Sequence, residues 1–308
     1  MTSVPESAAA PEVLVADQLL PFTEQLRLEP DGEDRFLGQC HPSRRGVGFG
    51  GSVLSQSLAA AARTAPEGRP VHSLHAYFLR PVMCSKKVSY SALRLRDGRS
   101  YSLRQVNARQ SFGDVLSMHA SFKAPEEPSY EQQSTAPKVP GPEGLPDGLR
   151  DHPAREVRDG VELRYLPPED TPPPSPDGEI RQYTWSRIRT PLPDEPAYHA
   201  CALAYLSDVS LAATAIGAFR PVFPVVGPPP ARMASLDHAM WFHRPLRADT
   251  WLLFAQRSKT AADGRTLCHG EFWTEDGELV ASASQEALMY VARRTQEAGA
   301  GAGADPLS

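Results

Sequence analysis

HAYFLRP, residues 75–81, and AMWFHRP, residues 239–245, decide the fold because they are copies of one pattern. Both place two aromatic side chains shortly before an Arg-Pro pair, and 164 residues separate them. Two further pairs follow in the same order: DGRSYSL (97–103) with DGRTLCH (263–269), and GDVLSMHAS (113–121) with GELVASASQ (277–285). Because the order is kept and the spacing barely drifts, the sequence indicates a tandem duplication.

Each copy has the same predicted order of elements. A short strand, at Asp34–Gln39 or Ile180–Arg189, precedes a loop and a long run of good helix formers, residues 52–65 or 197–217. Four strand-like runs follow, and in the second copy they span Met233–His243, Trp251–Thr260, Thr266–Thr274 and Leu279–Ala292. This order predicts an α+β unit, and because both helices are apolar nearly all round, we expect each to be covered on more than one side.

Proline divides the two copies. Sixteen of the 31 prolines lie between residues 125 and 196, where a helix or central strand cannot continue because each proline fixes φ and removes a donor. The ends of the chain hold few residues that a core could use. We therefore expect five segments: a poorly ordered N-terminus (1–24), an N-terminal unit (25–124), a proline-rich linker (125–178), a C-terminal unit (179–292) and a disordered tail (293–308).

Composition and charge are those of a soluble globular protein. The 308 residues are 41% hydrophobic and 22% charged, and the net charge of -5 argues against nucleic acid or an anionic membrane as the main partner. The start, MTSVPESAAAPEV, lacks the basic residues and apolar run of a signal peptide, and no stretch approaches the roughly 18 apolar residues of a membrane span. We expect a cytoplasmic protein with no membrane span.

Motifs of the common enzyme classes are absent or incomplete. Residues 46–51, GVGFGG, form a G-x-G-x-x-G, but the surrounding pattern is not the βαβ unit that a dinucleotide site requires. We interpret these glycines as a tight turn into the helix, whose unpaired N–H groups are able to hold an oxygen atom. G-x-S-x-G, H-E-x-x-H and the P-loop motif do not occur, and the four cysteines lie far apart. We expect neither a metal nor a cofactor.

Asp208 is the most informative acid in the chain. On a helix its same-face neighbours are apolar or aromatic, which is a setting where a carboxylate needs water or a partner; they are Ala204, Tyr205, Leu211 and Ala212. A polar stripe or the mouth of a loop explains Asp208 as well as a functional role does. The first-copy helix has no acid, and this asymmetry favours a function.

The last strand of each copy shows a second asymmetry. In the repeat, Ser121 of GDVLSMHASFKAP stands where Gln285 of GELVASASQEALM stands. Ser282, Ser284 and Gln285 break strict alternation. Either one of them faces inward to make a hydrogen bond, or they belong to an exposed strand face.

Five blocks of sequence carry a family resemblance. They are ASLDHAMWFHRP and ADGRTLCHGEFWTEDGELVASASQEALM in the second copy, and GFGGSVLSQSLAAAA, VHSLHAYFLRP and DGRSYSLRQV in the first. Together they resemble the type II acyl-CoA thioesterase family, from about residue 25 to 292 with a poor match in the linker. The resemblance implies a tandem (double) hot-dog fold, in which two antiparallel sheets, each wrapped round a long central helix, are fused side by side.

The resemblance also implies an activity and a set of residues. Such enzymes hydrolyse fatty acyl-CoA to free acid and CoA without a covalent serine intermediate. Their catalytic Asp, hydroxyl residue and Gln fall on Asp208, Ser235 and Gln285. Because a thiol leaving group has a pKa of about 8.5, no strong general acid is needed. We expect Asp208 to activate a water molecule that Ser235 and Gln285 position.

Further expectations concern substrate contacts and partners. Gly50 and Gly51 are candidates for the oxyanion site, and Arg80 and Arg244 either meet CoA phosphates or form salt bridges at strand ends. We expect acyl-CoA as the substrate and a homo-oligomer formed through hot-dog sheets. A hydratase or dehydratase acting on acyl thioesters and a non-catalytic acyl-CoA-binding protein are the alternatives, since a fold does not determine a reaction.

Overall fold

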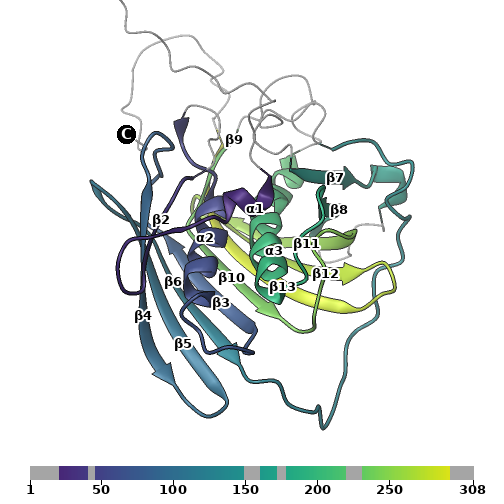
Figure 1. Ribbon diagram of the computed structural model, residues 1–308. Helices are drawn as coiled ribbons and strands as arrows, with labels where there is room; N and C mark the ends of the chain where they lie inside the picture. Colours follow the sequence, from purple (N-terminus) through teal and green to yellow (C-terminus); the bar gives the residue numbers. More distant parts are fainter. Residues whose placement is uncertain (1–20, 41–45, 149–159, 172–177, 220–230, 292–308) are drawn as a thin grey trace, which may run out of the picture.

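The computed structural model describes residues 21–40, 46–148, 160–171, 178–219 and 231–291. The expected disordered tail and most of the expected disordered N-terminus lie outside the described residues. Figure 1 shows one large sheet with two helices, α2 and α3, side by side on one of its faces.

The described residues form two long helices and the strands of this sheet. The helical segments are α1 (Phe22–Gln25), α2 (Gly50–Ala62), α3 (Pro196–Ser210) and the 3-10 segments η4 (Pro168–Asp170) and η5 (Ala212–Phe219). The first-half strands are β1 (Glu29–Pro30), β2 (Arg35–Gly38), β3 (Val71–Phe78), β4 (Val88–Asp97), β5 (Tyr101–Gln110) and β6 (Gly113–Lys123). The remaining strands are β7 (Val161–Tyr165), β8 (Ile180–Ile188), β9 (Ala231–Ser235), β10 (Asp237–Phe242), β11 (Leu252–Ala262), β12 (Arg265–Thr274) and β13 (Leu279–Val291).

The strand order repeats in reverse across the middle of the sheet. The 13-stranded sheet runs β1-β2-β4-β5-β6-β3-β10-β13-β12-β11-β8-β7, and β9 pairs with β13. The halves meet where β3 pairs antiparallel with β10, with Leu74 opposite Met240. Three of the four antiparallel strands predicted for the second copy are confirmed as β11, β12 and β13, whereas the predicted strand Met233–His243 is divided into β9 and β10, which pair with different parts of β13. The two halves share one continuous sheet.

The two long helices are buried on almost every side. Leu54 and Leu58 of α2 and Leu203 and Leu206 of α3 are all at most 1% exposed, because each helix packs on the sheet and on the other helix. The stretch Pro196–Ile216 is by length and composition apolar enough to span a membrane, but 78% of its apolar 18-residue window is buried inside the fold. That burial is the property of a core helix and explains its apolar composition.

A short N-terminal segment covers the helix pair. Phe22 of α1 is 1% exposed, and its ring meets the edge of Tyr205 of α3 at 5.3 Å between centroids. Leu26 and Leu28 are also buried. The expected boundary after residue 24 therefore falls inside a packed element, because apolar side chains near the start of this unit supply contacts that a composition argument overlooked.

The proline-rich segment does more than connect the halves. β7 adds an edge strand beside β8, and Val161 and Leu163 are buried there. Trp185 Nε1 donates to the Pro140 carbonyl at 2.9 Å, and Leu145 joins the same apolar cluster. The expected linker, 125–178, thus differs from the structure, because proline lacks an N–H but keeps its carbonyl acceptor and its apolar ring.

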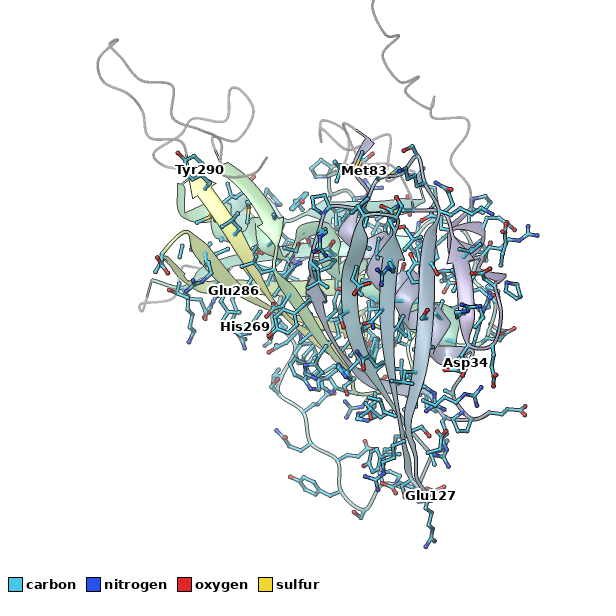
Figure 2. All side chains as sticks on the ribbon, turned by 90° about the vertical axis from the view of Figure 1, so that its left-hand side faces the viewer. Asp34, Met83, Glu127, His269, Glu286 and Tyr290 are labelled. Atoms are coloured by element: carbon cyan, nitrogen blue, oxygen red, sulfur yellow. The ribbon has the colours of Figure 1, made fainter. Side chains whose placement is uncertain are left out.

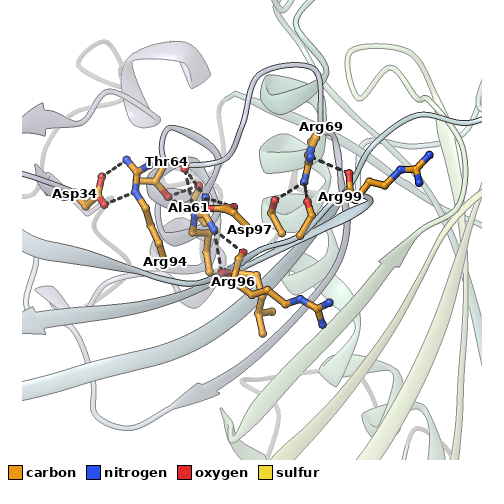
Figure 3. A network of polar contacts seen from close by, with 12 residues as sticks. Asp34, Ala61, Thr64, Arg69, Arg94, Arg96, Asp97 and Arg99 are labelled. Atoms are coloured by element: carbon orange, nitrogen blue, oxygen red, sulfur yellow. Dashed lines mark hydrogen bonds and ion pairs between the residues drawn. The ribbon is translucent and has the colours of Figure 1, made fainter.

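A buried arginine, Arg104, ties the end of α2 to the hairpin of β4 and β5. Figure 3 shows its partners Thr64, Arg96 and Asp97 in one network of polar contacts. Arg104 is 0% exposed. Its Nη2 donates to the Thr64 carbonyl at 2.8 Å and to both carboxylate oxygens of Asp97, and its Nη1 donates to the Arg96 carbonyl at 3.2 Å. These bonds satisfy a fully buried guanidinium.

We expect Arg104→Met to lower the free energy of unfolding by about 3 kcal/mol, because carbonyls that are buried around it lose their donor. Urea denaturation with Arg94→Met as the matched control measures this. Arg94 pairs with Asp34 through a largely solvent-exposed side chain, so its loss is expected to be much smaller. Equal losses in the two variants would contradict the assignment of Arg104 as the structural arginine.

Candidate active site

Three separate elements bring Asp208, Ser235 and Gln285 together. Asp208 lies near the end of α3, Ser235 ends β9, and Gln285 points inward from β13 with 0% exposure. Gln285 Nε2 donates to Asp208 Oδ1 at 2.6 Å and to Ser235 Oγ at 2.9 Å. Ser235 Oγ also lies 3.4 Å from Asp208 Oδ1. The three residues expected from the sequence thus form one hydrogen-bonded cluster.

The Gln285 amide determines how this cluster is bonded. Its nitrogen has two hydrogens, and the contacts to Asp208 and Ser235 use both. Its oxygen, Oε1, is buried and has no hydrogen-bond partner among the described residues. Asp208 is only half-buried, so the carboxylate stands at the boundary between the core and solvent.

The start of α2 closes the other side of the carboxylate. A Cβ atom added to Gly50 would lie 2.8 Å from Asp208 Oδ2, and one added to Gly51 would lie 2.9 Å from the Tyr205 carbonyl. Because Gly50 is the first residue of α2, the positive dipole end of this helix lies beside the carboxylate, and its first turn has no side-chain cap. The cluster therefore contains parts of both halves of the chain.

The structure corrects the reason for these glycines. Among residues 46–51, only Gly46 has a positive φ, of 74°. Gly50 and Gly51 do not need glycine for a tight turn. A Cβ atom at Gly50 would meet the Asp208 side chain, and one at Gly51 would lie 2.5 Å from the Phe49 ring and 2.9 Å from the Tyr205 carbonyl of α3, so the space itself excludes a side chain.

Arg80 and Arg244 bond to neighbouring strands. Arg80 Nη1 donates to the Asp114 carbonyl at 2.7 Å, and Arg244 Nη1 donates to the Leu279 carbonyl at 3.0 Å. The two bonds occupy equivalent places in the two halves. Of the two expectations for these arginines, the geometry favours a structural role at strand ends.

The residue of the first half that is equivalent to Gln285 differs from the one that the sequence repeat predicted. His75 pairs with His119 and Ala239 pairs with Ser284, so the offset is 239 − 75 = 164 in one strand and 284 − 119 = 165 in the next. Gln285 therefore corresponds to 285 − 165 = 120, which is the buried Ala120. The expected match to Ser121 is wrong by one residue, and in a strand such a shift moves a side chain to the opposite face. Ser121 bonds His72 instead, at 2.7 Å.

A second pair beside Asp208 escaped the sequence reasoning. Ser207 Oγ lies 2.8 Å from His238 Nε2, and His238 is 1% exposed. Burial lowers the pKa of His238 to about 3, so the ring is neutral at physiological pH. The only sequence signal was its place between Asp237 and the apolar Met240 in the repeated block.

Family comparisons agree across both halves. Residues 41–123 match the family described as "Acyl-CoA thioesterase N-terminal domain", and residues 133–289 match "Acyl-CoA thioesterase C-terminal domain". The second match begins inside the expected linker, which accords with the packing of Leu145 and β7 on the second half.

Individual relatives extend over most of the chain. "Acyl-CoA thioesterase 2" of Haemophilus influenzae is 33% identical over 291 residues, which is 89% of this chain and 99% of the relative. Human "Acyl-coenzyme A thioesterase 8" is 34% identical over 296 residues, which is 89% of this chain and 90% of the relative.

Solved structures give the same picture. The acyl-CoA thioesterase II TesB2 from Mycobacterium marinum has a TM-score of 0.76 and 36% identity, and the match covers 90% of this chain and 99% of that one. A hot-dog fold protein from Alicyclobacillus acidocaldarius has a TM-score of 0.72 and 22% identity, and the match covers 88% of this chain and 98% of that one. This similarity supports the fold alone.

Proposed function

The chain belongs to the acyl-CoA thioesterase family and is a thioester hydrolase, and from this premise we propose that it cleaves fatty acyl-CoA with a water molecule activated by Asp208. The observation that carries the proposal is the Gln285 amide, which donates to both Asp208 and Ser235. The carboxylate, the hydroxyl and the amide of the family's catalytic set are all present in this cluster. Their presence favours catalysis over binding alone, since a protein that only binds acyl-CoA has no need of a positioned water.

In the proposed reaction the Gln285 amide holds the base in place. Its Nε2 donates to Asp208 Oδ1 and to Ser235 Oγ, which fixes the direction of the carboxylate. Asp208 accepts one proton of the water, and Ser235 and Gln285 position the same water, so that the water oxygen presents a lone pair to the thioester carbonyl carbon. Orientation of this kind is a large part of catalysis.

The steps then follow from thioester chemistry. The water oxygen bonds to the carbonyl carbon while Asp208 takes its proton, and collapse of the tetrahedral intermediate breaks the C–S bond. The CoA thiolate leaves readily because its thiol pKa is only about 8.5, and it takes up the proton that Asp208 had accepted, which restores the base. Backbone N–H groups at the uncapped start of α2, at Gly50 and Gly51, are the proposed oxyanion donors, each worth about 3 kcal/mol.

Thiol titration on acyl-CoAs from short to long chain tests the activity. We expect one CoA thiol released per acid formed, with a dependence on chain length. Hydration of an enoyl-CoA without thiol release would favour the hydratase alternative. Tight binding of every acyl-CoA without turnover would favour a binding protein.

Replacement of Ser235 by alanine is expected to lower kcat about tenfold, because Gln285 loses the acceptor that holds its amide in plane with Asp208. Ser235→Thr keeps the hydroxyl and is expected to recover most of this loss. Steady-state thiol release with both variants measures the effect. A Ser235→Ala enzyme with unchanged kcat would remove the hydroxyl from the mechanism.

The arrangement proposed for the fold is a pair of fused hot-dog units. The mirrored strand order about β3 and β10 supports it, as does the presence of one long helix in each half. The pairing of the helices, with Gly50 of one against Asp208 of the other, makes each half incomplete alone.

A homo-oligomer formed through the sheet is a further part of the proposal. Figure 2 shows the face turned away from the helices, where His269 and Glu286 lie. On the same face, the rings of His75 and Trp241 meet edge to face across the junction of β3 and β10, at 5.3 Å between centroids, and Trp241 is 37% exposed, which leaves apolar surface there for a second copy. Light scattering is expected to give a multiple of 33.6 kDa, and a monomer at every concentration would contradict the proposal. A cytoplasmic location stays a prediction.

A further inference from the structure

A second contact joins α3 to the sheet one residue before Asp208. His238 of β10 and Gln285 of β13 are neighbours across the strand pair, since Ala239 is opposite Ser284. Both side chains point to the helix side and are at most 1% exposed. Gln285 bonds Asp208, and His238 bonds Ser207 at 2.8 Å. Two adjacent helix residues are therefore held by two adjacent strand residues.

The direction of the Ser207 bond follows from its single hydrogen. Ser207 Oγ is 2.8 Å from the Ala204 carbonyl, an acceptor that bonds more strongly than the Met240 sulfur at 3.3 Å. If the hydroxyl instead donated to His238 Nε2, the ring hydrogen would sit on Nδ1 as a buried donor with no acceptor in the part of the chain that the structure describes, which is costly. We therefore assign the hydroxyl hydrogen to Ala204, so that Oγ accepts from the Nε2–H of His238. Nδ1 then carries the lone pair, and it has no hydrogen-bond partner among the described residues.

A histidine at position 238 is compatible with Asp208 acting as a base. The pKa of His238, lowered by burial to about 3, keeps the ring uncharged. A lysine or arginine at this position would add a positive charge beside Asp208 and make its carboxylate a weaker base. A neutral imidazole donates a hydrogen bond without this cost.

We infer that His238 is a positioning residue for Asp208, acting through Ser207. Ser210 Oγ, at the end of α3, also donates to Gln256 Oε1 of β11 at 3.0 Å, but the bonds of Ser207 and Asp208 are the ones that hold the helix at the carboxylate itself and so fix its direction. This inference rests on the proposed function, because it assigns to Asp208 the role of the base.

Two substitutions of His238 separate the roles of its two nitrogens. The amide nitrogen of glutamine reaches the place of Nε2, whereas that of asparagine reaches only the place of Nδ1. We expect His238→Asn to lower kcat about tenfold with KM unchanged, and His238→Gln to restore most of that loss. Ser207→Ala, which is well suited to a helix, is expected to lower kcat to the same extent.

A matched control and a double variant complete the experiment. His199 is another buried histidine; it lies on α3, far from Asp208 along the helix, and its Nδ1 accepts from the Ala248 N–H at 3.2 Å. His199→Asn is expected to leave kcat within about twofold of wild type, whatever its effect on thermal unfolding. Adding His238→Asn to Ser207→Ala is expected to cause no further loss, because both act through one bond.

Three results would overturn the inference: full kcat in folded His238→Asn, equal kcat in His238→Asn and His238→Gln, or additive losses in the double variant. If His238→Asn does not fold, full kcat in Ser207→Ala would overturn the inference in its place. Asp208→Asn distinguishes this failure from that of the proposed function. Loss of activity in Asp208→Asn beside a fully active Ser207→Ala rejects only the role of His238, whereas an active Asp208→Asn rejects the proposed base itself.

Discussion

Asp208→Asn is expected to lower kcat at least about a hundredfold, which is the low end of the range for general base catalysis. Asparagine keeps an Oδ1 acceptor for Gln285 Nε2, so the contact seen at 2.6 Å can persist and the fold should stay intact. What is lost is the ability to take a proton from water. Steady-state thiol release and thermal unfolding, measured on the same preparation, report the two properties separately.

Asp237→Asn is the matched control for this variant. Asp237 lies two residues after Ser235, and its Oδ1 accepts from the Glu286 N–H at 2.7 Å, outside the catalytic cluster. Asparagine retains that acceptor, so kcat should change by less than about twofold. Near-full activity in Asp208→Asn, or an equal loss in both variants, would remove Asp208 as the base.

Gln285→Glu is expected to change both the rate and its pH dependence. The new carboxylate would lie where Nε2 now meets Asp208 Oδ1, and two carboxylates so close share a proton because they cannot both be charged without strong repulsion. The apparent pKa of the pair is therefore raised, and at neutral pH the base is largely protonated. We expect kcat near pH 7 to fall by about a hundredfold.

The sign of the pH effect distinguishes this variant from simple loss of the amide. Since the base works only when deprotonated, the kcat of Gln285→Glu should rise as the pH increases through the raised pKa. Gln285→Ala also loses the bonds to Asp208 and Ser235 but adds no charge, so its kcat should be low without that rise. A Gln285→Glu enzyme with the pH profile of Gln285→Ala would show that the two side chains do not meet in solution.

Local patterns in the sequence determined much of the fold. The Ala-rich and Leu-rich runs predicted α2 and α3, although α3 ends at Ser210 and the rest of the predicted helix is the 3-10 segment η5. Alternation predicted β11, β12 and β13 close to their observed bounds but merged β9 and β10 into one strand. These elements depend on periods of 3.6 and 2 residues, which a single sequence displays. Elements with weak or interrupted patterns were missed, as α1 and β7 show.

The prediction of the candidate site depended on the family resemblance more than on local sequence patterns. From the residues alone, Asp208 suited a polar stripe as well as a function, and Gln285 suited an exposed strand face. The same reasoning misplaced Ser121 and assigned no role to His238. In each case the missing information was which face a side chain takes and what stands opposite.

The sequence by itself determined that the chain is duplicated, α+β and built on two apolar helices, because repeats and periodicity are properties of neighbouring residues. Only the tertiary structure decided that Gln285 meets Asp208, 77 positions away, and that Ala120 takes the equivalent place in the first half. Such contacts depend on strand register and on how closely two helices approach. A shift of one residue in register turns a side chain from the core to solvent, and no local pattern is sensitive to it.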